Sequence, residues 1–335
     1  MTDTLAQLST LCIYSAMGIY ALAFVAFALD LARRGARATI PAEVPSAVER
    51  RAEAAEAAQA GGSTTTLTRI STRVEDEVHR GGATSKSLRV AFALTILGFA
   101  FHLTADILRG VAAGRVPWAN MWEFSMTGTL VIVGVFLLVN LRFDLKYLGT
   151  FVLGLVCILL MIATVQYYVP VVPLPPALQS YWLVIHIMVA ILGTAFFALG
   201  FALSGLQLLQ ARRERQIEES RPQQFRFLAT IPGSKTLENL AYRVNIVGFI
   251  FWTFTLIAGA IWAEKAWGRY WGWDTKEVWT FIIWVIYAGY IHARATRGWR
   301  GSRSAWLAII GFSAVMFNFG VVNVFFHGLH AYSGL

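Results

Sequence analysis

The stretch Tyr181–Leu209, YWLVIHIMVAILGTAFFALGFALSGLQLL, decides the fold of this chain. It contains no Asp, Glu, Lys or Arg. An α-helix rises 1.5 Å per residue, so about 20 apolar residues cross the hydrocarbon core of a bilayer. Because this stretch is longer than that, it predicts a transmembrane helix.

Seven further apolar runs occur along the 335 residues, which are 57% hydrophobic and 14% charged, with a mean hydropathy of +0.57. A soluble protein carries roughly a quarter charged residues. The seven runs are Leu11–Leu31, Leu88–Leu108, Phe124–Leu141, Leu148–Tyr168, Val244–Trp262, Val278–Ala293 and Ala305–Phe326. We therefore predict an all-α fold, a polytopic membrane helical bundle of about eight transmembrane helices.

Positive charges are distributed unevenly among the segments that connect the runs. Of the 28 Lys and Arg, 23 fall in alternate segments: ten in 33–89, two in 142–146, seven in 212–243 and four in 294–303. Cytoplasmic segments of membrane proteins carry such an excess. The pattern predicts that both termini lie outside the cytoplasm. It also accounts for the net charge of +9, so we expect no nucleic-acid partner.

Three regions follow from these patterns. Residues 1–31 are expected to form the first transmembrane helix, and residues 32–87 a cytoplasmic linker that is partly disordered. Residues 88–335 are expected to form a membrane core with an outer tryptophan-rich segment at 262–279. The loop 212–243 is amphipathic in part, and we expect it to lie along the membrane surface.

The stretch Trp267–Trp279, WGRYWGWDTKEVW, is the most unusual part of the chain. It holds four tryptophans and a tyrosine between two apolar runs. An interfacial belt places single Trp or Tyr residues at helix ends, which does not account for four indoles here. The stretch indicates an aromatic platform that binds a large, flat, apolar molecule. Asp274 and Glu277 also suit the first turn of a helix, and this structural interpretation stays open.

Two histidines share the predicted outer face with this segment. His186 lies near the outer start of one run, and His330 follows the last run. Two neutral imidazoles across an aromatic shelf can supply axial ligands to a haem iron, with indoles covering the porphyrin and basic side chains meeting the propionates. A histidine near a helix end is as often an interfacial or capping group, so a structural role stays open for each. Zinc is disfavoured, because no carboxylate or cysteine accompanies the histidines at zinc spacing.

The run Trp262–Gly301, WAEKAWGRYWGWDTKEVWTFIIWVIYAGYIHARATRGWRG, resembles the tryptophan-rich signature of haem-handling proteins in cytochrome c maturation. The closer similarity is to the System II family of CcsA or ResC type, called CcsB in some naming. VPWANMWEF at 116–124 is similar to the outer-loop motif of that family. LQSYWLVIH at 178–186 and GLHAY at 328–332 resemble its flanking histidine motifs. The resemblance covers roughly Ser87–Leu335.

The resemblance implies a haem b substrate and iron ligands at named positions. His186 and His330 correspond to the external ligands. His292 corresponds to a membrane-embedded histidine of an inner haem site, whose companion ligand comes from a partner subunit. The other residues that the resemblance places in haem binding are Trp267, Trp271, Trp273, Asp274, Trp279, Glu123 and Arg269. His102 and His327 match no ligand of the family, and a role for His102 as a second intramembrane ligand stays open.

The function that the resemblance implies is transport of haem to the outer face and its presentation there for covalent attachment to CxxCH sites of apocytochrome c. The chain would be a subunit of a cytochrome c haem lyase or synthase in the bacterial plasma membrane, active only with a ResB-like partner. Its working face would be extracytoplasmic, in contact with membrane lipid. Cys12 and Cys157 lie singly in apolar runs and predict no thiol chemistry in this chain. The function that the resemblance implies also requires a thioredoxin-like reductant, which keeps the cysteines of the substrate reduced.

Two other classes of function stay open at the level of sequence. One is a secondary transporter of another hydrophobic or anionic solute, with Arg109 and Glu123 lining a path, although no inverted repeat or broken helix pair is visible. The other is a haem b redox subunit. That function needs ligand pairs at two depths, which His102 and His292 do not obviously supply.

Overall fold

The structure is a computed structural model that describes residues 2–37, 85–174, 178–222, 225–296, 298–326 and 328–330. Most of the predicted linker at 32–87, from residue 38 to residue 84, lies outside the described residues, and so does His327.

The described residues contain helices and connecting segments and no strand, which confirms the all-α prediction. The long helices are α1 (Thr2–Arg37), α4 (Lys86–Ala113), α5 (Met121–Val139), α6 (Gly149–Gln166), α7 (Tyr181–Glu218), α8 (Ser234–Trp267), α9 (Thr275–Thr296) and α10 (Ser302–Phe317). The short elements are the 3₁₀ turns η1 (Lys146–Leu148) and η3 (Arg226–Thr230), the π-helical turn η4 (Asn318–Val322) and α11 (Asn323–Phe325).

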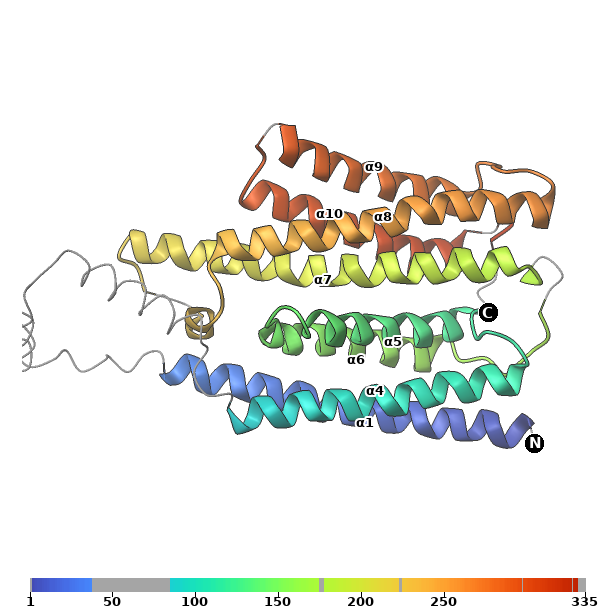
Figure 1. The fold of residues 1–335 in the computed structure, drawn as a ribbon, viewed down its shortest axis with the longest axis horizontal. Coiled ribbons are helices and arrows are strands. Elements are labelled where there is room, and N and C mark those ends of the chain that lie inside the picture. The colour runs from blue at the N-terminus through green and yellow to red at the C-terminus, as the bar shows by residue number, and fades with distance from the viewer. Residues whose placement is uncertain are drawn as a thin grey trace, which may run out of the picture.

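Seven candidate membrane spans occur among the described residues: α1, α4, α5, η1 with α6, α7, α8, and α10 with η4 and α11. Helix α9 is not among them, because its many Trp and Tyr side chains and its charged ends lower its hydropathy. It nevertheless runs beside α8 and α10, in the opposite direction to each, along the length of the bundle (Figure 1). As a result, the start of α1 and the end of α11 lie at the same end of the molecule.

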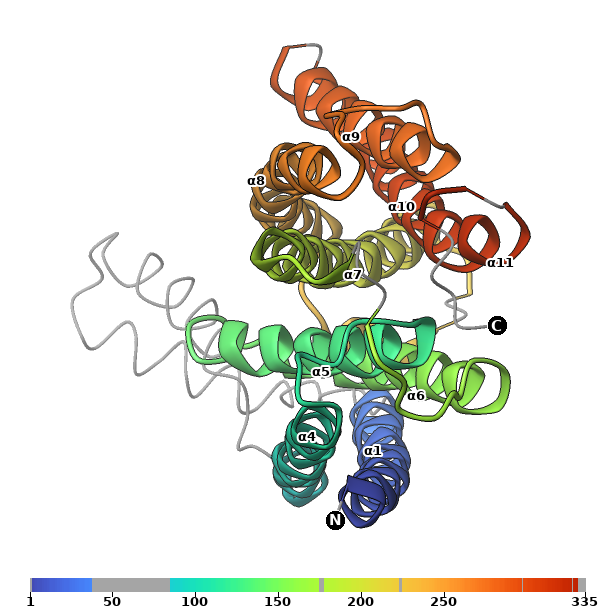
Figure 2. The ribbon, with the colours of Figure 1, turned by 90° about the vertical axis from the view of Figure 1, so that its right-hand side faces the viewer.

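The helices form two groups. Helices α1, α4, α5 and α6 lie on one side and α7, α8, α9 and α10 on the other, and α5 and α6 pack against α7 where the groups meet (Figure 2). Long apolar side chains cover the outer surface of the first group; Leu11 and Leu22 are each 62% exposed and Val111 is 61% exposed. Surface of this kind suits contact with lipid tails and is unfavourable in water.

The segment predicted as an amphipathic surface loop at 212–243 has a different structure. Helix α7 continues to Glu218 and α8 begins at Ser234, so helices occupy both ends of the expected loop. Between them η3 packs against α1, and Leu228 is fully buried there. The amphipathic pattern predicted apolar contact correctly, but the contact is with protein, which a pattern in one segment does not distinguish from contact with lipid.

Candidate functional site

The tryptophan-rich segment connects α8 to α9 and is closed by a defined turn at its start. Helix α8 ends at Trp267, and Gly268 follows with φ 71°, donating its N–H to Glu264 O at 2.8 Å. This left-handed conformation favours glycine, since other residues bring Cβ too close to the backbone. The turn directs the chain sharply away from α8 immediately after Trp267.

Helix α9 begins with a reciprocal capping arrangement. The Asp274 carboxylate accepts the N–H of Lys276 at 2.9 Å, and the Glu277 carboxylate accepts those of Gly272 and Asp274 at 2.8 and 3.0 Å. These bonds satisfy backbone groups that a helix start leaves unpaired. The structural interpretation of Asp274 and Glu277 that the sequence left open is therefore observed.

Asp274 also connects this segment to the stretch that carries His330. Its Oδ2 accepts the N–H of Leu329 at 2.8 Å, and its Oδ1 lies 3.3 Å from His330 Nδ1. The His330 ring, with the N–H groups of Lys276 and Leu329, holds the pKa of the Asp274 carboxyl well below its usual range. Asp274 thus positions His330 beside the tryptophan segment.

His186 is held from α7 against α8. Its Nδ1 lies 3.0 Å from Thr255 O, and because a carbonyl only accepts, Nδ1 carries the proton and Nε2 keeps a lone pair. Gly259 makes this close approach possible, since a Cβ there would lie 2.7 Å from His186 Cε1. The hydrogen bond assigns the tautomer and fixes the ring.

Trp262 joins the two histidines. The His186 ring stacks on its indole with centroids 5.8 Å apart and planes 16° apart, and the His330 ring meets it edge-on at 5.5 Å. Trp267 completes the cluster, with its ring centroid 4.7 Å from that of Trp262 and 4.8 Å from that of His330. Two histidines that are 144 positions apart in the chain therefore share one aromatic contact network.

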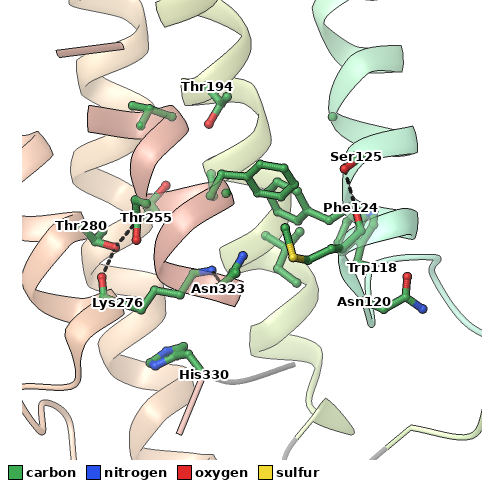
Figure 3. Close-up of a pocket in the computed structure, with 18 of the residues that line it drawn as sticks. Trp118, Asn120, Phe124, Ser125, Thr194, Thr255, Lys276, Thr280, Asn323 and His330 are labelled. Carbon is green, nitrogen blue, oxygen red and sulfur yellow. Dashed lines mark hydrogen bonds between the residues drawn. The ribbon is translucent and has the colours of Figure 1, made fainter. Parts of the chain in front are cut away.

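Both histidines line a cavity of about 350 Å³ between α5, α6, α7 and the α10–α11 end; it is called the histidine cavity below. Figure 3 shows Lys276 reaching toward Asn323, to which its ammonium group donates, with His330 beside them and Phe124 and Trp118 on the α5 side. Asn323 directly follows the π-helical turn η4, a distortion that is frequent at functional sites. The cavity thus combines apolar walls, one cation and two imidazoles.

None of the four predicted tryptophans is among the described residues that line the histidine cavity, although Trp267 contacts His330. Trp271 and Trp273 contact each other with ring centroids 6.0 Å apart, and Trp273 is 75% exposed with φ 60°. Trp279 packs on Phe317, with ring centroids 4.4 Å apart. The structure therefore brings Trp267 to the histidines and leaves the other three tryptophans apart from them.

Glu123 and Arg269 have structural contacts. Glu123 is fully buried, and its carboxylate meets Arg109 at 3.0 Å, Arg115 at 2.7 Å and the N–H of Ala119 at 3.0 Å. These bonds hold the connection between α4 and α5 and satisfy both carboxylate oxygens. The Arg269 guanidinium covers Gly272 so closely that a side chain at 272 would collide with it.

The two remaining described histidines are not among the residues that line the histidine cavity. His292 is exposed, 17 residues after Thr275, which is about 25 Å along α9. His102 is fully buried: its Nε2 lies 2.9 Å from Met126 O, and its Nδ1 lies 3.3 Å from the Tyr20 hydroxyl. Since both nitrogens of His102 are engaged, it supplies no axial ligand in this arrangement.

Residues 118–330 match the family described as Cytochrome C assembly protein. The chain belongs to this family. It is a multi-pass membrane protein of cytochrome c biogenesis, and the family resemblance seen in the sequence is confirmed.

Curated relatives agree with this assignment. "Cytochrome c biogenesis protein CcsA" of Guillardia theta is 34% identical over 262 residues, which is 73% of this chain and 86% of that protein. The protein of the same name from Chlamydomonas reinhardtii is 35% identical over 235 residues, 68% of this chain and 63% of that protein. The one from Chlorella vulgaris is 33% identical over 257 residues, 68% of this chain and 81% of that protein.

A solved structure has the same fold. "Cytochrome c Heme Lyase CcmF" matches 94% of this chain with a TM-score of 0.59 and 16% sequence identity. The chain spans 46% of the length of that protein. At this identity the likeness shows the arrangement of helices alone.

Trp262 lies in the predicted tryptophan-rich segment without an assigned role there, and the sequence does not single out Gly259. Trp262 ends an apolar run and looks like a single belt tryptophan, and Gly259 looks like any small residue of a membrane helix. A signal was nevertheless present for Trp262, because it lies five residues before Trp267, near the same end of α8.

Proposed function

We propose that the chain holds haem at the histidine cavity and presents it there for attachment to apocytochrome c. One observation carries the proposal: His186 Nδ1 is hydrogen-bonded to Thr255 O, His330 Nδ1 lies 3.3 Å from Asp274 Oδ1, and neither Nε2 has a hydrogen-bond partner among the described residues. Metal-binding histidines usually have this arrangement, in which the acceptor fixes the ring and increases the basicity of the free nitrogen.

The cavity also suits the rest of a haem molecule. Its apolar wall, with Trp262 and Phe124 among its members, matches the macrocycle, and the Lys276 ammonium group is placed to meet a propionate. The basic side chains predicted to meet the propionates are Lys265, Arg269 and Lys276, and of these three Lys276 lines the cavity. Because Trp262 touches both imidazoles, ligation of one iron by both rings requires this indole to move aside.

The protein contributes positioning to the chemistry that follows. Each thioether forms when the S–H of a CxxCH cysteine adds across a haem vinyl group, so no further reactant is consumed. Axial histidines hold the macrocycle in one place while the vinyl groups face the incoming segment. The histidine of the CxxCH segment then replaces one of the two ligands, and the haem leaves with its new protein.

The proposal includes partners and a location. A ResB-like membrane subunit supplies the ligand that completes an inner haem site at His292, and a thioredoxin-like protein keeps the CxxCH thiols reduced. The working face is extracytoplasmic, on the bacterial plasma membrane. The charge pattern supports this face, because the end of the bundle with the histidine cavity is the end that is poor in Lys and Arg.

Absorption spectra of the purified full chain test the proposal. We expect the wild type to show the spectrum of a haem with two histidine ligands, and His186→Ala combined with His330→Ala to lose this spectrum and cytochrome c maturation together. His102→Ala is the matched control, since His102 lies outside the cavity. Full haem content in the double variant would contradict the proposal.

Added imidazole gives a second test. In each single variant, His186→Ala or His330→Ala, free imidazole is expected to occupy the vacated position and restore part of the activity. A response in both variants supports ligation by both residues. Activity that stays absent in variants that still bind haem would assign these histidines a structural role.

A further inference from the structure

A second cavity, of about 560 Å³, lies in the same bundle and is not used by the proposed function. Its wall comes from α5, α6, α7 and α10, the helices that also surround the histidine cavity. Among the described residues that line it, all are apolar or glycine except Arg212, which lies at the end of the cavity farthest from the histidines along α7. It is called the apolar cavity below.

The two cavities are consecutive parts of one seam. Ile132 of α5 lines both of them. On α6, Phe151 and Leu155 line the apolar cavity, and Leu159 and Ile162 line the histidine cavity. Because these positions recur every three or four residues, they lie on one face of the helix.

Helix α7 shows the same continuity over a greater length. Its lining residues begin at Leu183 in the histidine cavity and end at Arg212 in the apolar cavity. This separation of 29 residues corresponds to about 44 Å of helix, more than the ~30 Å hydrocarbon core of a bilayer. A single face of α7 therefore borders cavities along the whole thickness of a membrane.

The two ends of the seam have the charges that an anionic, apolar molecule needs. Arg212 lies at one end and Lys276 at the other, and the wall between them is apolar or weakly polar. Among the described residues that line the apolar cavity there is no His, Cys, Met or Tyr, so its wall offers no axial ligand to iron. The histidine cavity offers two such ligands, His186 and His330. A haem in the apolar cavity is thus bound through its macrocycle and carboxylates alone.

We propose that haem reaches the histidine cavity along this seam, from the Arg212 end past Ile132. The inference rests on the proposed function and adds the route: haem passes between α5–α6 and α7–α10 of this chain. His292 is among the lining residues of neither cavity. The apolar cavity is a place of transit, since it lacks a ligand, and the histidine cavity is the place where haem is retained.

Three glycines provide matched variants to test the route. A Cβ built at Gly205 in the apolar cavity, at Gly128 in the histidine cavity, or at exposed Gly18 on α1 has no atom within 4 Å. A phenylalanine at each position therefore fills space without colliding at Cβ, and it replaces a poor helix former. The full chain is expressed in its membrane with the other biogenesis components and purified. Haem content is measured as isolated and again after titration with hemin in detergent.

The route predicts a different result for each variant. We expect Gly205→Phe to be isolated with at least fivefold less haem than wild type, and to take up hemin in detergent with the wild-type stoichiometry and spectrum. Gly128→Phe is expected to lose both the haem that is present on isolation and the uptake of hemin in detergent. Gly18→Phe is expected to keep both. If Gly205→Phe does not accumulate in the membrane, Gly205→Leu replaces it as a smaller obstruction.

Several results would overturn the route. Wild-type haem content in isolated Gly205→Phe would do so, and so would loss of hemin uptake by that variant in detergent, since the obstruction would then act on the outer site. A phospholipid retained stoichiometrically by wild type and lost from Gly205→Phe would assign the apolar cavity to lipid. Failure of the proposed function is distinguishable, because wild type itself would then show no spectrum that depends on His186 and His330.

Discussion

His186 and His102 show how the partners of the two imidazole nitrogens separate a candidate ligand from a structural histidine. His186 uses one nitrogen, at Thr255 O, and keeps the other free at a cavity. His102 uses both, because Met126 O must accept from Nε2–H and the Tyr20 hydroxyl then donates to Nδ1. The sequence places both in apolar runs and does not distinguish them, since the partners come from distant parts of the chain.

This difference gives a prediction for His102→Leu. We expect the haem spectrum to be unchanged and the protein to lose roughly 1–3 kcal/mol of stability, because the Tyr20 hydroxyl and Met126 O lose their buried partner. Thermal unfolding of the purified protein, followed by circular dichroism, measures the second effect. A shift in the haem spectrum would indicate that His102 reaches the iron.

A second prediction concerns Gly259, whose missing side chain leaves room for the His186 ring. In Gly259→Ala the new Cβ would lie 2.7 Å from His186 Cε1, so the ring must leave its hydrogen bond with Thr255 O. We expect haem content to fall severalfold, while helix stability is maintained, because alanine is the better helix former. Gly289→Ala is the control, since a Cβ there has no atom within 4 Å. Equal haem content in the two variants would contradict the packing argument.

Asp274 gives a prediction about acid. Its pKa in the folded protein lies below its unfolded value of ~3.9, so its contribution to stability is complete above that value and decreases as the pH falls below it toward the folded pKa. We expect the stability of wild type relative to Asp274→Asn to decrease as the pH falls below about 4. Above about pH 5 the plots of stability against pH for the two proteins are expected to be parallel. Unfolding measured across this range tests the sign. Parallel curves throughout would show that the interaction with His330 is absent in solution.

At the scale of single elements, the Glu123 carboxylate determines how α4 connects to α5. Two largely buried arginines, Arg109 and Arg115, share it, and it also accepts the N–H of Ala119. Removal of one member of such a group leaves an uncompensated buried charge, which costs about 3–5 kcal/mol. The contacts of this glutamate hold the backbone of the connection between α4 and α5, and the role in haem binding that the family motif implies for it stays a prediction.

Glu123→Ala is therefore expected to destabilise the protein by about 3–5 kcal/mol and to increase hydrogen exchange in residues 114–120 first. Glu219→Ala is the matched control. Glu219 pairs with Arg221 at 3.1 Å with both side chains more than half exposed, so its loss should cost less than about 1 kcal/mol. Equal effects of the two substitutions would contradict the burial argument.

The apolar runs predicted the long helices well, because a run of about 20 apolar residues can satisfy its backbone in lipid only as a helix. The ends of α7 and α8 were not predictable in the same way. Both continue beyond the apolar run into charged sequence, to Glu218 and from Ser234, because contacts with η3 and with each other extend them. Hydropathy marks where lipid begins and does not mark where a helix ends.

At the scale of the whole molecule, the sequence predicted the class of fold but not the seam. The lining of the two cavities depends on which faces of α5, α6, α7 and α10 meet, and each of these helices is apolar around most of its circumference. Periodicity therefore does not select the contacting face. The contact of Trp262 with His186 of α7 and with His330, which follows α11, was unpredictable for the same reason.

The number of crossings decides whether both histidines face the same compartment. Eight antiparallel helices return the chain to the end where α1 begins, and this result depends on α9, the helix that lacks the composition of a typical span. If α9 did not cross, the segment after it would face the opposite side, and the histidines would be separated by the membrane. The positive charges at 212–243 and 294–303 argue for a crossing, because they predict the same, cytoplasmic side for both segments.

Cysteine labelling in intact cells tests this topology, with Cys12 and Cys157 first replaced by serine. We expect Asp3→Cys and Gln179→Cys to react with a membrane-impermeant maleimide, whereas Lys235→Cys and Arg300→Cys react only after the membrane is permeabilised. Arg300 is the informative position, because it lies between α9 and α10, whereas Lys235 lies in the first turn of α8, the helix before α9. Labelling of Arg300→Cys without permeabilisation would mean that α9 does not cross the membrane as it crosses the bundle. His186 and His330 would then not meet at one haem.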